Sequence, residues 1–137
     1  MRRAAPLLFA LAVTAAVGCE ADKFNRQAVS GTVSMDGKPI PYGNIEFVPA
    51  ENQPTTVTLE IKDGKFGVVA AGGLAPGKYV VRVQGMDGPP PPPGDVPGVS
   101  AGPQPKSIVP DKNGAQSTET VGVQAGQKNE FTLALQK

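Results

Sequence analysis

The stretch TTVTLEIKDGKFGVVA, residues 55–70, decides the fold class of this chain. Apolar side chains occupy every second position from Val57 to Ile61, and polar side chains fill the positions between them. A two-residue period of this kind indicates a strand with one buried face. Asp63-Gly64 then provides the residue types that accept the positive φ angles of a tight hairpin turn. We therefore expect a β-hairpin over residues 55–70.

The same alternation recurs along the chain, and no amphipathic helix is indicated after residue 28. The predicted strands are 28–35, 43–49, 55–62, 65–70, 78–84, 118–124 and 129–136, with 107–110 as a candidate for a further brief strand or bridge. Short strands separated by turns are typical of two packed sheets. The sequence predicts an all-β fold, a seven-stranded antiparallel β-sandwich that forms one domain over residues 28–137.

A proline-rich segment interrupts the strand pattern between residues 86 and 106. It contains five consecutive prolines, 89–93, which lack backbone N–H donors and fix φ, so no sheet ladder can form there. We expect an exposed loop over 86–106. It is either a ligand for an aromatic-lined groove in a partner or a spacer between strands.

The composition excludes several classes of function. The chain has 13 Lys and Arg against 12 Asp and Glu, so it lacks the basic surplus of a nucleic-acid-binding protein. It has no histidine, which excludes a Ser-His-Asp triad, a Cys-His pair and any His-ligated zinc. We expect a protein that is not an enzyme, has no cofactor and binds no nucleic acid.

Five aspartates are candidate calcium ligands. They are Asp36, Asp63, Asp87, Asp95 and Asp111, and most of them stand beside glycine or proline. Calcium requires six to eight oxygen ligands that converge on one point, and the chain has no D-x-D-x-D-G loop. The sequence therefore favours turns at these positions, and no metal site is expected.

The first 27 residues have the organisation of an export signal. Residues 1–18 begin with Met1-Arg2-Arg3 and continue as an apolar segment too short to span a bilayer, as in a signal peptide. The single cysteine follows directly, at Cys19. A free thiol in an exported protein needs an explanation, because exported cysteines normally pair. The alternative is an unpaired cysteine beside an ordinary cleavage site.

The segment Ala16-Val17-Gly18-Cys19 resembles the lipobox of bacterial lipoprotein precursors. This resemblance implies that the Cys19 thiol carries a diacylglycerol and that the signal peptidase cuts just before it. Residues 19–27 then form a polar tether to a membrane, and Glu20 slightly favours the outer membrane. We expect an exported protein that is lipid-anchored to the cell envelope.

Three segments resemble the carboxypeptidase regulatory-like domain in their order and spacing. They are VSGTVSMDGKPIPYGNIEFVP (29–49), IKDGKFGV (61–68) and LAPGKYVVRVQG (74–85). The likeness rests on Gly31, Val33, Asp36, Gly37, Pro39, Asp63, Gly64, Phe66, Pro76, Gly77 and Tyr79. It implies a transthyretin-like (prealbumin-like) β-sandwich. It implies no catalysis, because in metallocarboxypeptidases this domain accompanies the zinc-bearing catalytic domain and supplies none of its ligands.

The expected function is a lipid-anchored envelope module with a binding or scaffolding role. Its partners are the membrane, through Cys19, and an envelope protein or glycan. One alternative is a carbohydrate-binding module with Tyr42, placed at a turn, as the ligand contact. Another is an accessory subunit that adds a strand to a partner's sheet edge.

Overall fold

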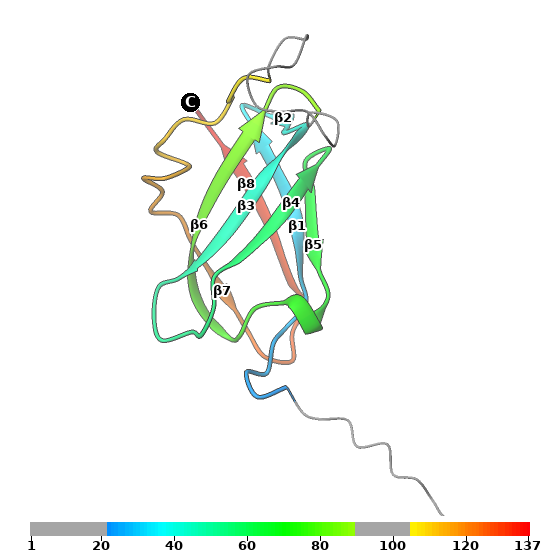
Figure 1. Cartoon of the computed structure of the whole chain (residues 1–137), viewed down its shortest axis with the longest axis vertical. Helices are drawn as coiled ribbons and strands as arrows, with labels where there is room; N and C mark the ends of the chain where they lie inside the picture. Colours follow the sequence, from blue (N-terminus) through cyan, green and yellow to red (C-terminus); the bar gives the residue numbers. More distant parts are fainter. Residues whose placement is uncertain (1–21, 90–104) are drawn as a thin grey trace, which may run out of the picture.

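The computed structural model of the chain describes residues 22–89 and 105–137, and this part is all-β (Figure 1). About half of the described residues lie in strands, and the one helical element is a 3₁₀ turn, η1 (Ala70–Gly72). The strands are β1 (Val29–Met35), β2 (Lys38–Pro39), β3 (Tyr42–Pro49), β4 (Val57–Lys62), β5 (Lys65–Val68), β6 (Gly77–Met86), β7 (Thr120–Val123) and β8 (Asn129–Leu135). The predicted all-β class is confirmed.

The strands form one curled sheet. Its main path runs β1-β5-β4-β3-β6-β7, with β8 on the other side of β1 and the short β2 beside the end of β1. The strands β7 and β8 stand at opposite ends of this path, yet only the turn at residues 124–128 separates them in the sequence. The sheet therefore curls around a single core (Figure 1).

Two features differ from the predicted strand arrangement. The pair β1–β8 is parallel, whereas every other strand pair in the described part is antiparallel. The strands run parallel because the turn at 124–128 reverses the chain after β7 and sends β8 in the direction of β1. The second difference is the extra strand β2, which pairs with Ser34 and Met35. Pro39 is tolerated there because β2 is an edge strand.

Both Asp-Gly pairs form tight turns, as the sequence predicts. Asp36 and Gly37 have φ angles of 49° and 79°, and Asp63 and Gly64 have 49° and 72°. These left-handed values match the twist of the flanking antiparallel strands, so they close two-residue hairpins. The first turn joins β1 to β2, and the second joins β4 to β5.

The inward positions of the strands build the core. Its buried hydrophobic residues are Val29, Val33, Met35, Ile40, Ile45, Phe47, Leu59, Ile61, Phe66, Leu74, Ala75, Tyr79, Val81, Val83, Val109, Val123 and Leu133. Phe47 lies near the centre, with ring centroids 5.9 Å from Phe66 and 6.4 Å from Phe131. Such tilted aromatic contacts add to the free energy gained from burial.

The chain after the proline-rich segment completes the wall of the fold. Residues 105–119 run along the half of β6 that β7 leaves uncovered. There the Val81 amide donates to the carbonyl of Glu119 at 2.8 Å, and the Val83 amide donates to that of Asn113 at 2.9 Å. The Asn113 side chain also donates to the Gln136 carbonyl at 3.0 Å. Residues 105–119 therefore connect β6 to the end of β8.

Tyr79 makes the free energy of unfolding of the domain depend on pH in the alkaline range. Its ring is fully buried, and its hydroxyl donates to the Ala75 carbonyl at 2.8 Å. Burial away from water raises the pKa of Tyr79 above its ordinary value of 10.0. The unfolded chain ionises first, so the stabilisation is complete below pH 10.0 and is lost as the pH rises from there through the folded-state pKa.

We therefore expect the free energy of unfolding to fall above pH 10.0, and to fall less steeply in Tyr79→Phe. Urea unfolding of both proteins across this pH range measures the two slopes. Lysines titrate in the same range, but they contribute equally to both proteins. Identical slopes in the two proteins would contradict the assignment to Tyr79.

Candidate functional site

The two ends of the domain are formed by different segments of the chain. At one end, the N-terminal pole, lie the turn at residues 22–27, η1 and the turn at 124–128 (Figure 1). At the other end, the distal pole, lie the Asp-Gly hairpins and residues 89 and 105, which flank the proline-rich segment. Most of the predicted loop 86–106 is outside the described residues. Its described base is held by the Asp87 carboxylate, which accepts from the Lys106 amide at 2.7 Å.

The predicted lipidation residue, Cys19, lies outside the described residues, but the chain that follows it is fixed to the N-terminal pole. The Asp22 carboxylate accepts from the Arg26 backbone amide at 2.9 Å and from the Arg26 Nε at 2.8 Å. The hydrogen bond from the Arg26 side chain lowers the pKa of Asp22. The described part of the predicted tether 19–27, residues 22–27, is thus a hydrogen-bonded turn.

Gln27 attaches this turn to the body of the domain. Its amide donates to the Leu74 carbonyl at 2.8 Å, and the Leu74 amide donates back at 3.1 Å. Its side-chain Oε1 accepts from the Gly126 amide at 3.1 Å. Leu74 is fully buried, so the contact anchors the start of the domain in the core.

The candidate ligand contact, Tyr42, is the first residue of β3 and lies at its distal end. It is half-buried and pairs with Lys62 on β4 and Met86 on β6. Paired residues of neighbouring strands project to the same face of a sheet. Gly43, the next residue, is buried, so Tyr42 belongs to the outer face.

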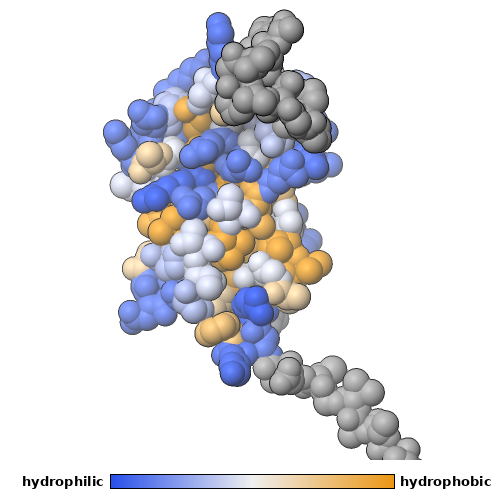
Figure 2. Space-filling view, in the orientation of Figure 1, coloured by the Kyte–Doolittle hydropathy of each residue, from blue (hydrophilic) through white to orange (hydrophobic). Residues whose placement is uncertain are grey.

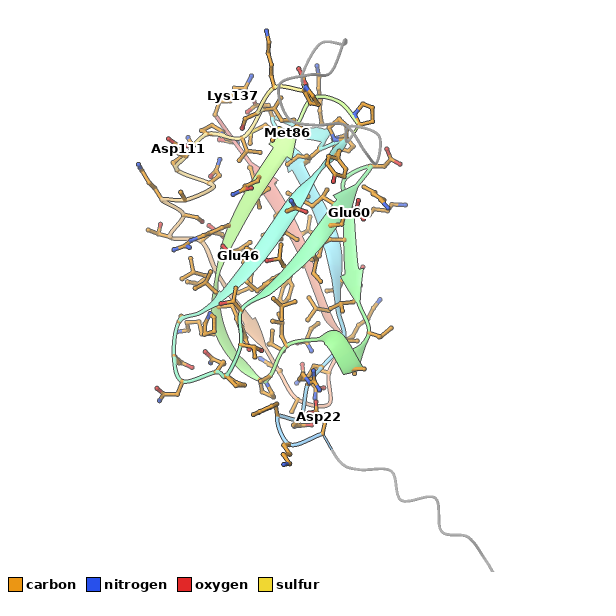
Figure 3. The ribbon with its side chains drawn as sticks, in the orientation of Figure 1. Asp22, Glu46, Glu60, Met86, Asp111 and Lys137 are labelled. Carbon is orange, nitrogen blue, oxygen red and sulfur yellow. The ribbon has the colours of Figure 1, made fainter. Side chains whose placement is uncertain are left out.

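Polar side chains continue down this outer face below Tyr42. We call this surface the β3 face (Figure 3). Its residues are Tyr42, Asn44 and Glu46 on β3, Thr58, Glu60 and Lys62 on β4, and Arg82, Gln84 and Met86 on β6. It therefore presents amide, carboxylate, hydroxyl and guanidinium groups in paired rows beside one aromatic ring.

A shallow depression of about 230 Å³ lies in the middle of the β3 face. In it, Arg82 Nη1 stands 3.7 Å from Glu46 Oε2. The Nε of Arg82 is buried and has no hydrogen-bond partner within the described part of the chain. The depression thus offers donors and acceptors to a ligand that carries both, such as one rich in hydroxyl groups.

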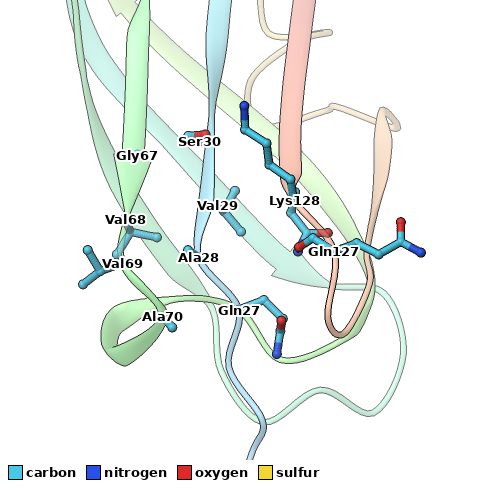
Figure 4. Close-up of a pocket in the computed structure, with 11 residues that line it drawn as sticks. Gln27, Ala28, Val29, Ser30, Gly67, Val68, Val69, Ala70, Gln127 and Lys128 are labelled. Carbon is cyan, nitrogen blue, oxygen red and sulfur yellow. The ribbon is translucent and has the colours of Figure 1, made fainter.

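The N-terminal pole carries two further hollows. One, of about 660 Å³, opens between the start of β1, the end of β5 and the start of β8 (Figure 4). Val69, 72% exposed, and Lys128 stand on its walls. The Lys128 ammonium lies 2.7 Å from the Glu130 carboxylate, and this hydrogen bond raises the pKa of Lys128. The second hollow, of about 510 Å³, is lined by Phe24, residues 51–54, Ala75 and Pro76.

The structure places the candidate calcium ligands apart. Over 22–89 and 105–137, no three His, Cys, Asp or Glu side chains gather as a metal site. Asp36 and Asp63 lie in the hairpin turns, and Asp111 accepts from the Gly114 and Gln116 amides through its backbone carbonyl. Asp95 lies outside the described residues. The described part also holds no helix that is long and apolar enough to cross a membrane.

Besides the short β2, two strands have a single strand neighbour in the described part. The strand β7 pairs only with β6, and β8 pairs only with β1. The outer edge of β8 is the longer of the two, with seven residues against four. It is the edge at which a partner strand could extend the sheet.

The sequence interpretation missed three residues that shape these surfaces. They are Arg82, Phe24 and Val69, none of which the sequence pattern marks as a candidate site residue. Alternation along β6 places Arg82 on the outer face, but its nearness to Glu46 depends on the β3–β6 register. Phe24 lies in the predicted polar tether 19–27, and Val69 lies in the predicted strand 65–70.

A scan of the chain against protein-family models and searches of curated proteins and of solved structures returned no match. The likeness to a known family therefore stays an expectation from the sequence motifs. A function for the chain therefore has to be argued from its own residues.

Proposed function

We propose that this protein is an exported lipoprotein of the bacterial cell envelope, anchored through acylated Cys19. Its domain is a transthyretin-like β-sandwich of the carboxypeptidase regulatory-like type, and it serves as a non-catalytic binding or scaffolding module for an envelope protein or glycan. Glu20 after the cysteine favours the outer membrane. The observation that carries the proposal is the lone Cys19, which follows an apolar signal segment and precedes a folded domain by only a few residues.

The described structure supports the family assignment through the residues that carry the motif. The Asp-Gly pairs form the hairpin turns, and Phe66 and Tyr79 are buried. These roles are structural, so the likeness concerns the fold and transfers no active site. The absence of histidine from the sequence supports a non-catalytic role.

The arrangement of the two poles supports a role in presentation. An anchor at Cys19 holds the N-terminal pole beside the membrane, because Gln27 ties the chain to that end of the domain. The distal pole, with the base of the proline-rich segment, then points away from the membrane. The β3 face runs between the poles and stays open to a partner.

Intact mass and palmitate labelling of the protein from its native host test the proposal. We expect a mature chain that begins at Cys19 and carries acyl mass, and we expect Cys19→Ser to abolish both the label and membrane association. A second variant, Cys19→Ser with Ser117→Cys, keeps one thiol in the chain at another place and should also remain unlabelled. An unmodified thiol in a freely secreted wild-type protein would contradict the lipoprotein assignment.

A second candidate function is carbohydrate binding at the β3 face. The observation that favours it is the half-buried ring of Tyr42 at the end of paired rows of hydrogen-bonding side chains. Sugars present apolar faces that stack on aromatic rings and hydroxyl groups that both donate and accept. The depression around Arg82 and Gln84 lies on the same face and offers such partners.

For this function we expect Tyr42→Ala to weaken saccharide binding at least tenfold, about 1.4 kcal/mol, while Tyr42→Phe keeps most of it. A glycan array probed with the wild-type protein identifies the ligand, and titration of the variants measures the loss. Gln84→Ala should also weaken binding, whereas Gln127→Ala, at the N-terminal pole, should not. Silence of the wild-type protein across a broad array would contradict carbohydrate binding.

A further inference from the structure

The exposed hydrophobic side chains of the described part are confined to one end of the domain. Only two large hydrophobic residues in residues 22–89 and 105–137 are exposed: Phe24 at 47% and Val69 at 72%. Phe24 lies in the turn 22–27, and Val69 directly precedes η1, so both belong to the N-terminal pole (Figures 1 and 4). Single exposed apolar residues are ordinary, but their restriction to one pole calls for a cause.

Apolar residues lie beside both side chains, among polar residues that also line the two hollows. Val69 continues into exposed Ala70 and Ala71, and the exposed Ala28 lines the same hollow. Phe24 shares the other hollow with Pro54 and Pro76 and with the polar residues 51–53. In the space-filling view, hydrophobic surface lies across the middle of the visible face and continues toward this pole, whose tip is mostly hydrophilic (Figure 2).

Two cations accompany the apolar surface. Lys23, in the N-terminal turn, and Lys78, at the start of β6, are exposed. Neither forms an ion pair with another described residue. Arg26 and Lys128 are neutralised by Asp22 and Glu130. An apolar surface beside unpaired lysines fits the boundary between acyl chains and phosphate headgroups.

The number of residues between Cys19 and the turn at 22–27 limits how far the domain can lie from the membrane. Three residue steps separate Cys19 from Asp22, so their Cα atoms are at most about 11 Å apart. The headgroup layer on one side of a bilayer is about 5–8 Å thick. A domain held on so short a connection touches the headgroups, and Phe24 lies only two residues beyond Asp22.

We propose that the N-terminal pole is a lipid-contacting surface that seats the domain on a phospholipid bilayer. Phe24 and Val69 enter the boundary between headgroups and acyl chains, and Lys23 and Lys78 approach the lipid phosphates. This inference rests on the acylation of Cys19 proposed above. It adds a fixed orientation, with the β3 face turned sideways and the distal pole turned outward.

The absence of tryptophan from the chain makes a direct test possible, because each variant then carries a single tryptophan, which can be excited apart from the two tyrosines. The acylated protein is reconstituted into phospholipid vesicles as Phe24→Trp, as Val69→Trp and, as the control at the distal pole, as Tyr42→Trp. We expect lipids with brominated acyl chains to quench the first two reporters strongly and to shift their emission to the blue. The Tyr42→Trp reporter should be unaffected by the brominated lipids.

Vesicle flotation and intact mass, measured on the same samples, separate the two proposals. If the protein is acylated and floats, but Phe24→Trp and Val69→Trp are quenched no more than Tyr42→Trp, the lipid-contacting surface is wrong and the lipoprotein assignment stands. If the native protein lacks acyl mass and does not float, both proposals are overturned. Strong quenching at the N-terminal pole alone supports both.

Discussion

Gly31→Ala is expected to destabilise the domain by at least about 3 kcal/mol, a large share of the stability of a chain this size. Gly31 lies in β1, between β5 on one side and β8 on the other. A Cβ atom at this position would collide with the backbone carbonyl oxygen of Phe131 and would stand 2.6 Å from the Phe66 ring. The oxygen belongs to the β1–β8 ladder, so the strand itself must shift.

A matched substitution controls for the loss of glycine. Gly122, in β7, has open space where its Cβ would stand, and its φ is not positive. Gly122→Ala is therefore expected to leave stability unchanged or to raise it by about 0.5–1 kcal/mol, since alanine restricts the unfolded chain. Urea unfolding measures both variants. A loss of less than about 1 kcal/mol in Gly31→Ala would show that β8 is not held as closely as the structure has it.

Phe47→Ala is expected to cost about 3–5 kcal/mol of unfolding free energy. The Phe47 side chain is fully buried at the centre of the core, between the rings of Phe66 and Phe131. Alanine removes its apolar surface and leaves a cavity that the surrounding strands cannot close, because all of them are held in register. The loss is also enough to leave part of the population unfolded at ambient temperature.

Phe24→Ala is the control, because it makes the same chemical change at a side chain that is 47% exposed. It should lower the free energy of unfolding by less than about 1 kcal/mol. Thermal or urea unfolding of the wild type and both variants gives the comparison. Equal losses in the two variants would mean that Phe47 is not the centre of the core.

The strands could be predicted because the alternation of apolar and polar residues that indicates a strand lies within a few neighbouring residues of the sequence. In β4, apolar residues at 57, 59 and 61 alternate with polar ones, and the structure buries Leu59 and Ile61 while it exposes Thr58 and Glu60. The Asp-Gly turns were equally readable, because few other dipeptides accept two positive φ angles.

Features that depend on contacts between distant segments could not be predicted. Val109 lies in 107–110, the candidate bridge, where Ser107 does pair with Met86, whereas Ile40 is fully buried between two prolines and outside any predicted strand. A single apolar residue outside a periodic stretch does not indicate which way it points. The parallel pairing of β1 with β8 could not be predicted either, because the order of strands in a sheet depends on the whole chain.

The candidate site residues also fall into two groups: those that the local sequence indicates and those that only the tertiary structure places on a common surface. Tyr42 was singled out from the sequence as an aromatic at a turn, whereas it begins β3. Its neighbours on the outer face, Lys62 and Met86, follow from the register of three strands. The exposure of Val69, which stands in a predicted strand, is likewise a result of tertiary packing, whereas Phe24 stands in the predicted polar tether 19–27 and its exposure agrees with that prediction.

The pairing of the first long strand with the last sets the order of folding. Val29 pairs with Asn129, 100 residues further along the chain, and this register continues to Met35 with Leu135. Contacts between such distant segments carry a high cost in loop-closure entropy and make folding slow. A nascent chain cannot complete β1 until its C-terminus has been synthesised. The β1–β8 ladder therefore stays unformed during synthesis, which would suit the export through a narrow channel that we propose for this chain.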